Sequence, residues 1–163
     1  MVTTGKTVYQ ITLPSERELV MTRVFNAPRE LVFRAHVDPA LIPQWWGPRG
    51  NTAFVDKLDA RPGGAWRFIV RRDDGSGEIA FFGEFREVVP PARFTWTFGF
   101  DGLQGPPGLE TYVFEERDGR TTLTSTGYFG SREERDAMLA SGMEAGANES
   151  GDRLDDLLAR LQT

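Results

Sequence analysis

The sequence predicts a single α+β domain in which a curved antiparallel sheet wraps a long C-terminal helix. Between residues 51 and 129, short runs of alternating apolar and polar residues are separated by turns rich in Gly, Pro and Asp, as in a series of antiparallel strands. From Met143 to Leu161, apolar residues recur every three or four positions, which predicts one long amphipathic helix. The length of 163 residues fits one domain with a substantial core.

The segment before the first strand has two interpretations. Residues 1–14 form either a flexible N-terminal tail or an extra edge strand, and residues 15–163 form the domain. Alternation of apolar residues predicts the first strand of the domain at residues 18–25. Two short helices follow this strand, each begun by a capping residue and a proline: Asn26 with Pro28, and Asp38 with Pro39.

Residues 51–129 supply six further strands, so the predicted sheet has seven. The strongest local signal is the pair Asp118-Gly119, because a two-residue type I′ hairpin turn needs positive φ at both positions. Two capping boxes follow the sheet, Ser131 with Glu134 and Ser141 with Glu144, and the second is predicted to begin the long helix.

Composition excludes several classes of protein. The absence of cysteine excludes disulfides and thiolate chemistry, and fits a reducing compartment. No apolar run has the length of a signal peptide or a membrane span, so we expect a cytoplasmic protein that does not insert into a membrane. The net charge of −5, with both signs scattered, argues against a nucleic-acid partner.

No recognisable catalytic constellation is present. The chain lacks a nucleophile elbow, a phosphate-binding loop and a zinc-protease motif. Without cysteine, a zinc site could use only the single histidine, His36, with carboxylates, which is a poor match to the usual ligand sets. We interpret His36 as a packing or surface residue of the first short helix. The sequence therefore predicts no catalytic residue, no metal and no cofactor, and leaves enzymatic activity open with a preference against it.

The aromatic side chains cluster on single faces of the predicted strands. Such faces need cover, either from a plain core or from a core that encloses a ligand cavity. Arg23 shares a face with apolar neighbours, so it either meets a ligand carboxylate or carbonyl, or pairs with a protein acid. Of Trp45 and Trp46, one anchors its helix and the other lines a cavity mouth or a partner surface, because consecutive helical residues diverge by about 100°.

Three stretches resemble a known family: FNAPRELVFRAHVDPALIPQWWGPRG, RPGGAWRF and MEAGANESGDRLDDLL. They resemble the domain of the heat-shock-protein-90 ATPase activator homologues, within the START-like helix-grip superfamily that also includes polyketide cyclases, lipid-transfer domains and the birch-pollen allergen. The resemblance covers about residues 17 to 161. His36 stands where Trp is common in the family, and Ala147-Asn148 replaces the Gly-Trp of one branch.

The resemblance implies a helix-grip fold with a cavity between the sheet and the C-terminal helix. The expected cavity lining is Arg23, Phe25, Trp45, Trp46, Trp66, Phe68, Phe81, Phe85, Trp96, Phe98, Tyr112, Ser125, Met143 and Ala147. The implied function is to bind or carry a small hydrophobic or aromatic molecule. The alternatives are a cyclase- or hydrolase-type enzyme on the same cavity and, less favoured, a chaperone-associated regulator. A homodimer is also compatible with the sequence.

Overall fold

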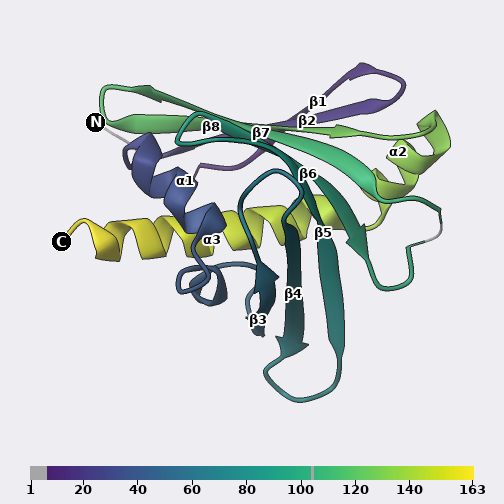
Figure 1. Ribbon diagram of the computed structural model, residues 1–163, viewed down its shortest axis with the longest axis horizontal. Helices are drawn as coiled ribbons and strands as arrows, with labels where there is room; N and C mark the ends of the chain where they lie inside the picture. The colour runs from purple at the N-terminus through teal and green to yellow at the C-terminus, as the bar shows by residue number, and fades with distance from the viewer. Residues whose placement is uncertain (1–6, 104) are drawn as a thin grey trace.

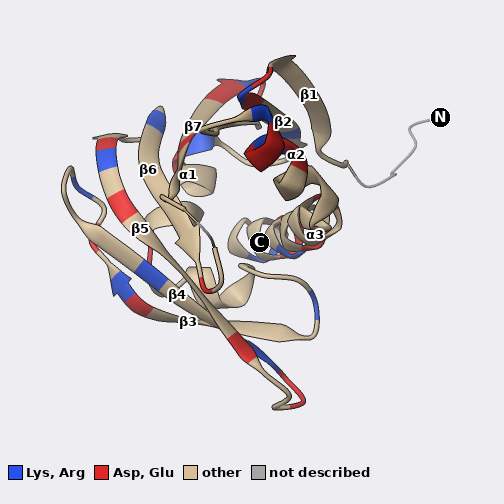
Figure 2. Ribbon diagram, turned by 90° about the vertical axis from the view of Figure 1, so that its right-hand side faces the viewer, with Lys and Arg blue, Asp and Glu red and all other residues tan. Residues whose placement is uncertain are grey.

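The structure is a computed structural model that describes residues 7–103 and 105–163. Eight antiparallel strands form one open sheet in the order β1-β2-β8-β7-β6-β5-β4-β3, which curls around the C-terminal helix α3 (Figures 1 and 2). The elements are, in chain order, β1 (Gln10–Ser15), β2 (Glu18–Phe25), α1 (Arg29–Val37), the 3₁₀ turn η1 (Ile42–Gln44), β3 (Asn51–Leu58), β4 (Ala65–Arg72), β5 (Glu78–Val89), β6 (Arg93–Phe100), β7 (Gly108–Arg117), β8 (Arg120–Tyr128), α2 (Arg132–Ala140) and α3 (Met143–Leu161). This is the helix-grip architecture expected from the sequence.

The number of strands differs from the expected seven. The extra strand is β1, which pairs antiparallel with β2 and places Ile11 opposite Met21. Its position at the edge of the sheet tolerates Pro14, because an edge strand can leave one side of its backbone unpaired. Residues 1–6 of the predicted tail lie outside the described residues.

The second of the two predicted short helices is a single 3₁₀ turn, η1. Asp38 does cap the start of this turn, as predicted, since its carboxylate accepts a hydrogen bond from the Ala40 N–H at 2.9 Å. The turn does not lengthen into an α-helix: Trp45, at φ −147, already leaves the helical region, and Gly47 follows at φ +100. The result is a tight loop that connects α1 to β3.

Other local predictions have mixed outcomes. The Asp118-Gly119 hairpin between β7 and β8 is confirmed, with φ of +53 and +75. The first capping box is confirmed, since the Ser131 hydroxyl accepts a hydrogen bond from the Glu134 N–H at 3.1 Å. The second box is wrong, because the Ser141 hydroxyl donates back to the Met138 carbonyl of α2 and Gly142, at φ +85, separates the two helices.

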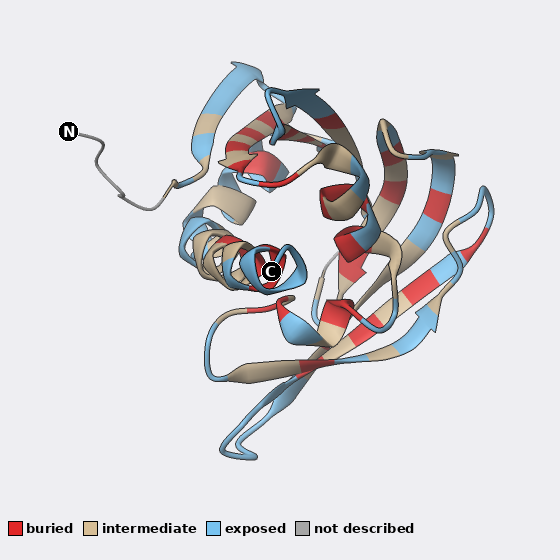
Figure 3. Ribbon diagram, turned by 90° about the vertical axis from the view of Figure 1, so that its left-hand side faces the viewer, coloured by how far each residue is buried: buried red, intermediate tan, exposed pale blue. Residues whose placement is uncertain are grey.

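Burial is unequal along α3. Its C-terminal half presents Leu154, Leu157 and Leu158 to the sheet and to α1, and each is at most 1% exposed. Its N-terminal half has smaller residues on the same side, and Met143 and Ala147 there are only half-buried. Buried positions alternate along the strands that curl around the helix (Figure 3), as expected for a sheet with one covered face.

Candidate ligand-binding site

Cross-strand pairing brings four side chains of the concave face together. Glu110 of β7 lies opposite Trp96 of β6, and Tyr112 of β7 lies opposite Ser125 of β8. Side chains at alternate positions of a strand share a face, so Glu110 and Tyr112 point to the same side as the fully buried Phe114. A carboxyl group therefore lies on the otherwise aromatic inner face.

Glu110 is held by two hydrogen bonds to one of its oxygens. Its Oε1 accepts from the indole Nε1–H of Trp96 at 2.8 Å and from the hydroxyl of Tyr112 at 2.9 Å. Its Oε2 has no hydrogen-bond partner among the described residues. This oxygen keeps some contact with solvent, because it is not one of the fully buried side-chain atoms that lack a partner; in the described part of the chain, that holds for Arg23 Nε. Burial raises the pKa of this carboxyl, and the two hydrogen bonds act in the opposite direction.

Tyr112 is fixed by its ring as well as by its hydroxyl. The ring stacks on Phe94, with centroids 4.7 Å apart at 16°, and meets Trp96 edge-on at 5.5 Å. Burial, and then the nearby Glu110 carboxylate, raise the pKa of the phenol well above its usual value. The hydroxyl therefore keeps its proton and acts as a donor to Glu110.

His36 lies beside this cluster, with its ring centroid 5.9 Å from that of Tyr112. Its Nδ1 lies 2.8 Å from the carbonyl oxygen of Val32, and its ring packs against Trp45 at 4.8 Å. Burial lowers its pKa to about 4, so the imidazole is neutral near neutral pH, with the Nδ1–H as donor to Val32. Of the two expected roles, packing or surface, the structure places His36 in the core.

Arg23 pairs with protein acids. Its guanidinium is fully buried, lies 2.9 Å from Asp152 and 2.7 Å from Asp155 of α3, and donates to the Asn148 carbonyl at 3.3 Å. It also lies over the ring of Phe25, 5.3 Å from the centroid. Its charge is thus compensated by the protein, and Phe25 is packed beneath it.

The two tryptophans of the α1–β3 connection point in different directions. Trp45 is 5% exposed and donates from Nε1 to the Ala35 carbonyl at 3.0 Å, which anchors the turn to α1. Trp46 is half-buried and contacts the concave face, with centroid distances of 5.0 Å to Phe81 and 5.2 Å to Phe68. It therefore lies next to the strands that were expected to line a cavity.

The remaining expected lining residues fall into two groups. The first is sealed by protein, at 0–1% exposure: Phe25, Trp66, Phe68, Phe85 and Trp96. Trp66 and Trp96 stack on each other at 4.0 Å and 17°. The second group keeps accessible surface: Trp46, Phe81, Phe98, Tyr112, Met143 and Ala147. Ser125, at 7% exposure, is buried but less completely than the first group. A ligand on this face would touch the second group.

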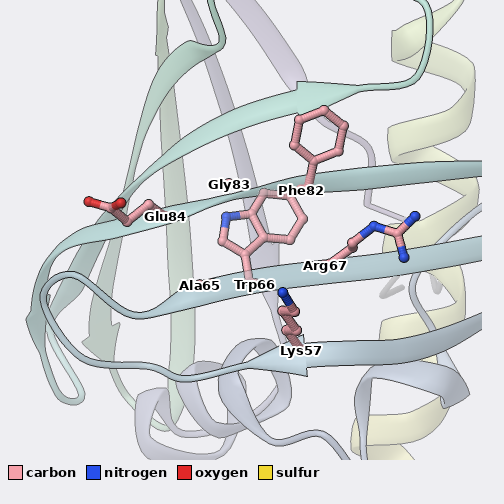
Figure 4. Close-up of a pocket in the computed structure, with 7 residues that line it drawn as sticks. All are labelled: Lys57, Ala65, Trp66, Arg67, Phe82, Gly83 and Glu84. Atoms are coloured by element: carbon pink, nitrogen blue, oxygen red, sulfur yellow. The ribbon is translucent and has the colours of Figure 1, made fainter.

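An open groove of about 490 Å³ lies on the opposite, convex face of the sheet (Figure 4). It is lined by Lys57, Ala65, Trp66, Arg67, Phe82, Gly83 and Glu84. Arg67 is paired with Asp56 at 3.0 Å. A Cβ atom at Gly83 would meet the Thr97 carbonyl oxygen and Trp66 Nε1, so the missing side chain lies on the packed inner side of the sheet and does not form this groove.

Sequence reasoning missed Glu110. The neighbouring positions Leu109, Thr111 and Val113 are as apolar as the Glu110 face, so alternation alone could not decide which face of β7 is inward. The signal lies in the strand register: Glu110 is opposite Trp96, whose apolar strand face was recognised.

The described residues contain no group of three or more acidic, His or Cys side chains placed to hold a metal ion. Within the same residues, none of the helices combines the length and hydropathy that a bilayer crossing requires.

The sheet that grips a C-terminal helix, with a partly open aromatic face between them, defines a helix-grip domain. The chain belongs to the family described as activator of Hsp90 ATPase homolog 1-like proteins, whose model matches residues 26–159. No curated protein matches the sequence.

Solved structures support this assignment. A protein from Rhodobacter sphaeroides is 28% identical, with a TM-score of 0.87, and the match covers 94% of this chain and 99% of that one. Protein Ms6760 from Mycobacterium smegmatis is also 28% identical, with a TM-score of 0.84 over 96% and 99% of the two chains. A protein from Silicibacter pomeroyi that carries the name AHSA1 is 26% identical, with a TM-score of 0.71 over 90% and 99%.

Proposed function

We propose that this protein binds a small apolar or aromatic molecule between the concave face of the sheet and the N-terminal half of α3. The observation that carries the proposal is the unequal burial of this face. Leu154, Leu157 and Leu158 fill one end completely, whereas Ala147 and Met143 leave the rings at the other end partly uncovered. Exposed aromatic surface on a concave, otherwise buried face is where an apolar ligand gains the most from leaving water.

A fluorescence titration with the neutral probe N-phenyl-1-naphthylamine tests this function. The wild-type protein should enhance and saturate the emission of the probe. Ala147→Trp should abolish the enhancement, because Ala147 lies on the helix face of Gly151 and Leu154 and a large ring there occupies the space between helix and sheet. Ala145→Trp is the matched control, since Ala145 is exposed on the same helix. Equal binding by the two variants would contradict the proposal.

A second candidate is an enzyme of the cyclase or hydrolase kind, favoured by the Glu110 carboxyl beside Tyr112. A carboxyl with a raised pKa in an apolar site is a suitable general base for a proton next to a carbonyl group. The test is deuterium exchange at the methyl group of 2-acetonaphthone in D₂O, in which a proton passes to Glu110 and a solvent deuteron replaces it. Exchange by the wild type that Glu110→Gln abolishes would support catalysis, and no exchange would leave binding alone.

Two partners are tested separately. The family description names an activator of the Hsp90 ATPase, so a pull-down with that chaperone measures whether this chain associates with it. The strands β1 and β3 are the two edges of the open sheet, so a homodimer could form by strand pairing. Light scattering coupled to size-exclusion chromatography gives the oligomeric state.

A further inference from the structure

We propose that the concave site selects ligands that present a hydrogen-bond donor, such as a phenol, an alcohol or a secondary amine, and discriminates against ligands that present a carboxylate. This inference rests on the proposed function and names the chemistry of the ligand's polar group. It follows from two residues: Glu110 offers an open acceptor to the site, and Arg23, a buried cation of β2, is already neutralised by the protein.

The open acceptor is the Oε2 atom of Glu110. Both protein donors, Trp96 Nε1 and the Tyr112 hydroxyl, converge on Oε1, which leaves the other oxygen without a partner in the described part of the chain. Glu110 itself is half-buried, so this oxygen is reachable. In its ionised form, a carboxylate oxygen in an apolar surrounding binds a neutral donor more strongly than a water-exposed acceptor does.

The inner face offers a carboxylate no comparable partner. The two buried arginines are paired with protein groups, Arg23 with Asp152 and Asp155, and Arg135 with Asp136 and the Ser15 carbonyl. Arg23 Nε has no hydrogen-bond partner within residues 7–103 and 105–163, but it is sealed from solvent, so a ligand does not reach it. His36, next to Tyr112, is neutral near neutral pH. A ligand carboxylate would lose its hydration, meet no unpaired buried arginine among the residues that the structure describes, and lie close to Glu110.

The half-exposed rings lie at a suitable reach from this acceptor. Phe98 is two positions along β6 from Trp96, the residue opposite Glu110, and diagonal neighbours of this kind are roughly 7–8 Å apart. Phe98 leads on to Phe81, at 5.8 Å between centroids, and Phe81 to Trp46, at 5.0 Å. A flat aromatic body can pack along these rings while its hydroxyl or N–H meets Oε2.

Three naphthalenes that differ in one group test the inference: 2-naphthol, 2-methoxynaphthalene and 2-naphthoate. Their dissociation constants are measured by calorimetry at neutral pH, with Ala147→Trp as the check that each binds at the concave site. We expect 2-naphthol to bind about tenfold more tightly than 2-methoxynaphthalene, the ratio expected for one hydrogen bond to a charged acceptor, and 2-naphthoate to bind most weakly.

Glu110→Gln supplies the matched variant. The amide oxygen can take over the two bonds from Trp96 and Tyr112, which turns the amide N–H₂, a donor, toward the ligand. The preference for 2-naphthol should therefore shrink to within about threefold, and 2-naphthoate should gain. Glu84→Gln, on the exposed convex face, should leave the order unchanged.

The outcomes separate the two proposals. If no naphthalene binds in a manner that Ala147→Trp blocks, the proposed binding function is wrong. If all three bind there but with equal affinity, or with 2-naphthoate strongest, binding stands and the donor preference is overturned. An unchanged order in a folded Glu110→Gln protein would also overturn it, and the wild-type order alone decides the matter if that variant does not fold.

Discussion

The guanidinium of Arg23 packs against α3 at Gly151. A Cβ atom at position 151 would lie 2.7 Å from Cζ of Arg23 and 3.2 Å from its Nε, closer than unbonded atoms approach. The missing side chain therefore makes room for a buried cation between β2 and α3. Asp152 and Asp155 flank the gap and neutralise the charge.

Gly151→Ala should destabilise the protein by about 2–4 kcal/mol, because the added methyl group displaces a buried, ion-paired guanidinium. The free energy of unfolding in urea measures the effect. Gly146→Ala is the control in the same helix: an added Cβ there meets nothing within 4 Å, so higher helix propensity should stabilise the protein by about 0.5–1 kcal/mol. Equal effects of both substitutions would contradict the packing described for Arg23.

Removing the two acids of this ion pair should reduce the stability of the protein more than removing the arginine. Arg23 has a side-chain exposure of 0%, whereas Asp152 and Asp155 have 19% and 33%. Removing both acids, in the double variant Asp152→Asn and Asp155→Asn, leaves a buried cation and should cost about 3–5 kcal/mol. Arg23→Met should cost less, since the two carboxylates can be hydrated where they are. Urea unfolding compares the variants, and a larger loss for Arg23→Met would reject this asymmetry.

His36 should make the protein less stable in mild acid. Its pKa is about 4 in the folded protein and about 6.5 when unfolded, so the unfolded chain binds more protons between these values. The stability associated with the neutral imidazole is present above pH 6.5 and is lost as the pH falls to about 4, by about 3 kcal/mol in total. His36→Phe removes this titration, so the difference in unfolding free energy between wild type and variant should shrink along the same pH range. A constant difference would show that His36 does not titrate on unfolding.

Tyr112→Phe should raise the pKa of Glu110 further. The Tyr112 hydroxyl is one of two donors to the carboxyl, and donation of a hydrogen bond favours the charged form. The measurement is a carbon-13 NMR titration of the Glu110 carboxyl. Tyr128→Phe is the control because Tyr128 is 40% exposed at the end of β8, so it should leave that pKa unchanged. A fall in the pKa of Glu110 in Tyr112→Phe would contradict the hydrogen-bond assignment.

Much of the fold follows from local pattern. The Asp118-Gly119 turn was predictable because two adjacent residues at positive φ restrict the choice of amino acid, and α3 because its apolar residues recur at helical spacing. The predictions that failed were also local. Asp38 does initiate a turn, but the helix stops within one 3₁₀ turn, and Ser141 ends α2 instead of beginning α3.

The candidate site was predictable in its aromatic part and not in its polar part. Phe81, Phe98 and Trp46 were expected on the inner face, and the contacts among their rings place them together there. Glu110 was absent from the expectation, because both faces of β7 carry apolar residues. The register of β7 against β6 sets the inward face.

The sequence by itself determined the strands between residues 18 and 128, the Asp118-Gly119 turn and the long helix, because each depends on residues close together in the chain. The tertiary structure decided what Arg23 and Glu110 do. Arg23 meets Asp155, 132 positions away in the chain, so the choice between a ligand and a protein acid depended on where α3 docks. Glu110 turns inward only because three strands pair in one register. Distant contacts set the charge of the concave face, and strand periodicity carries no information about them.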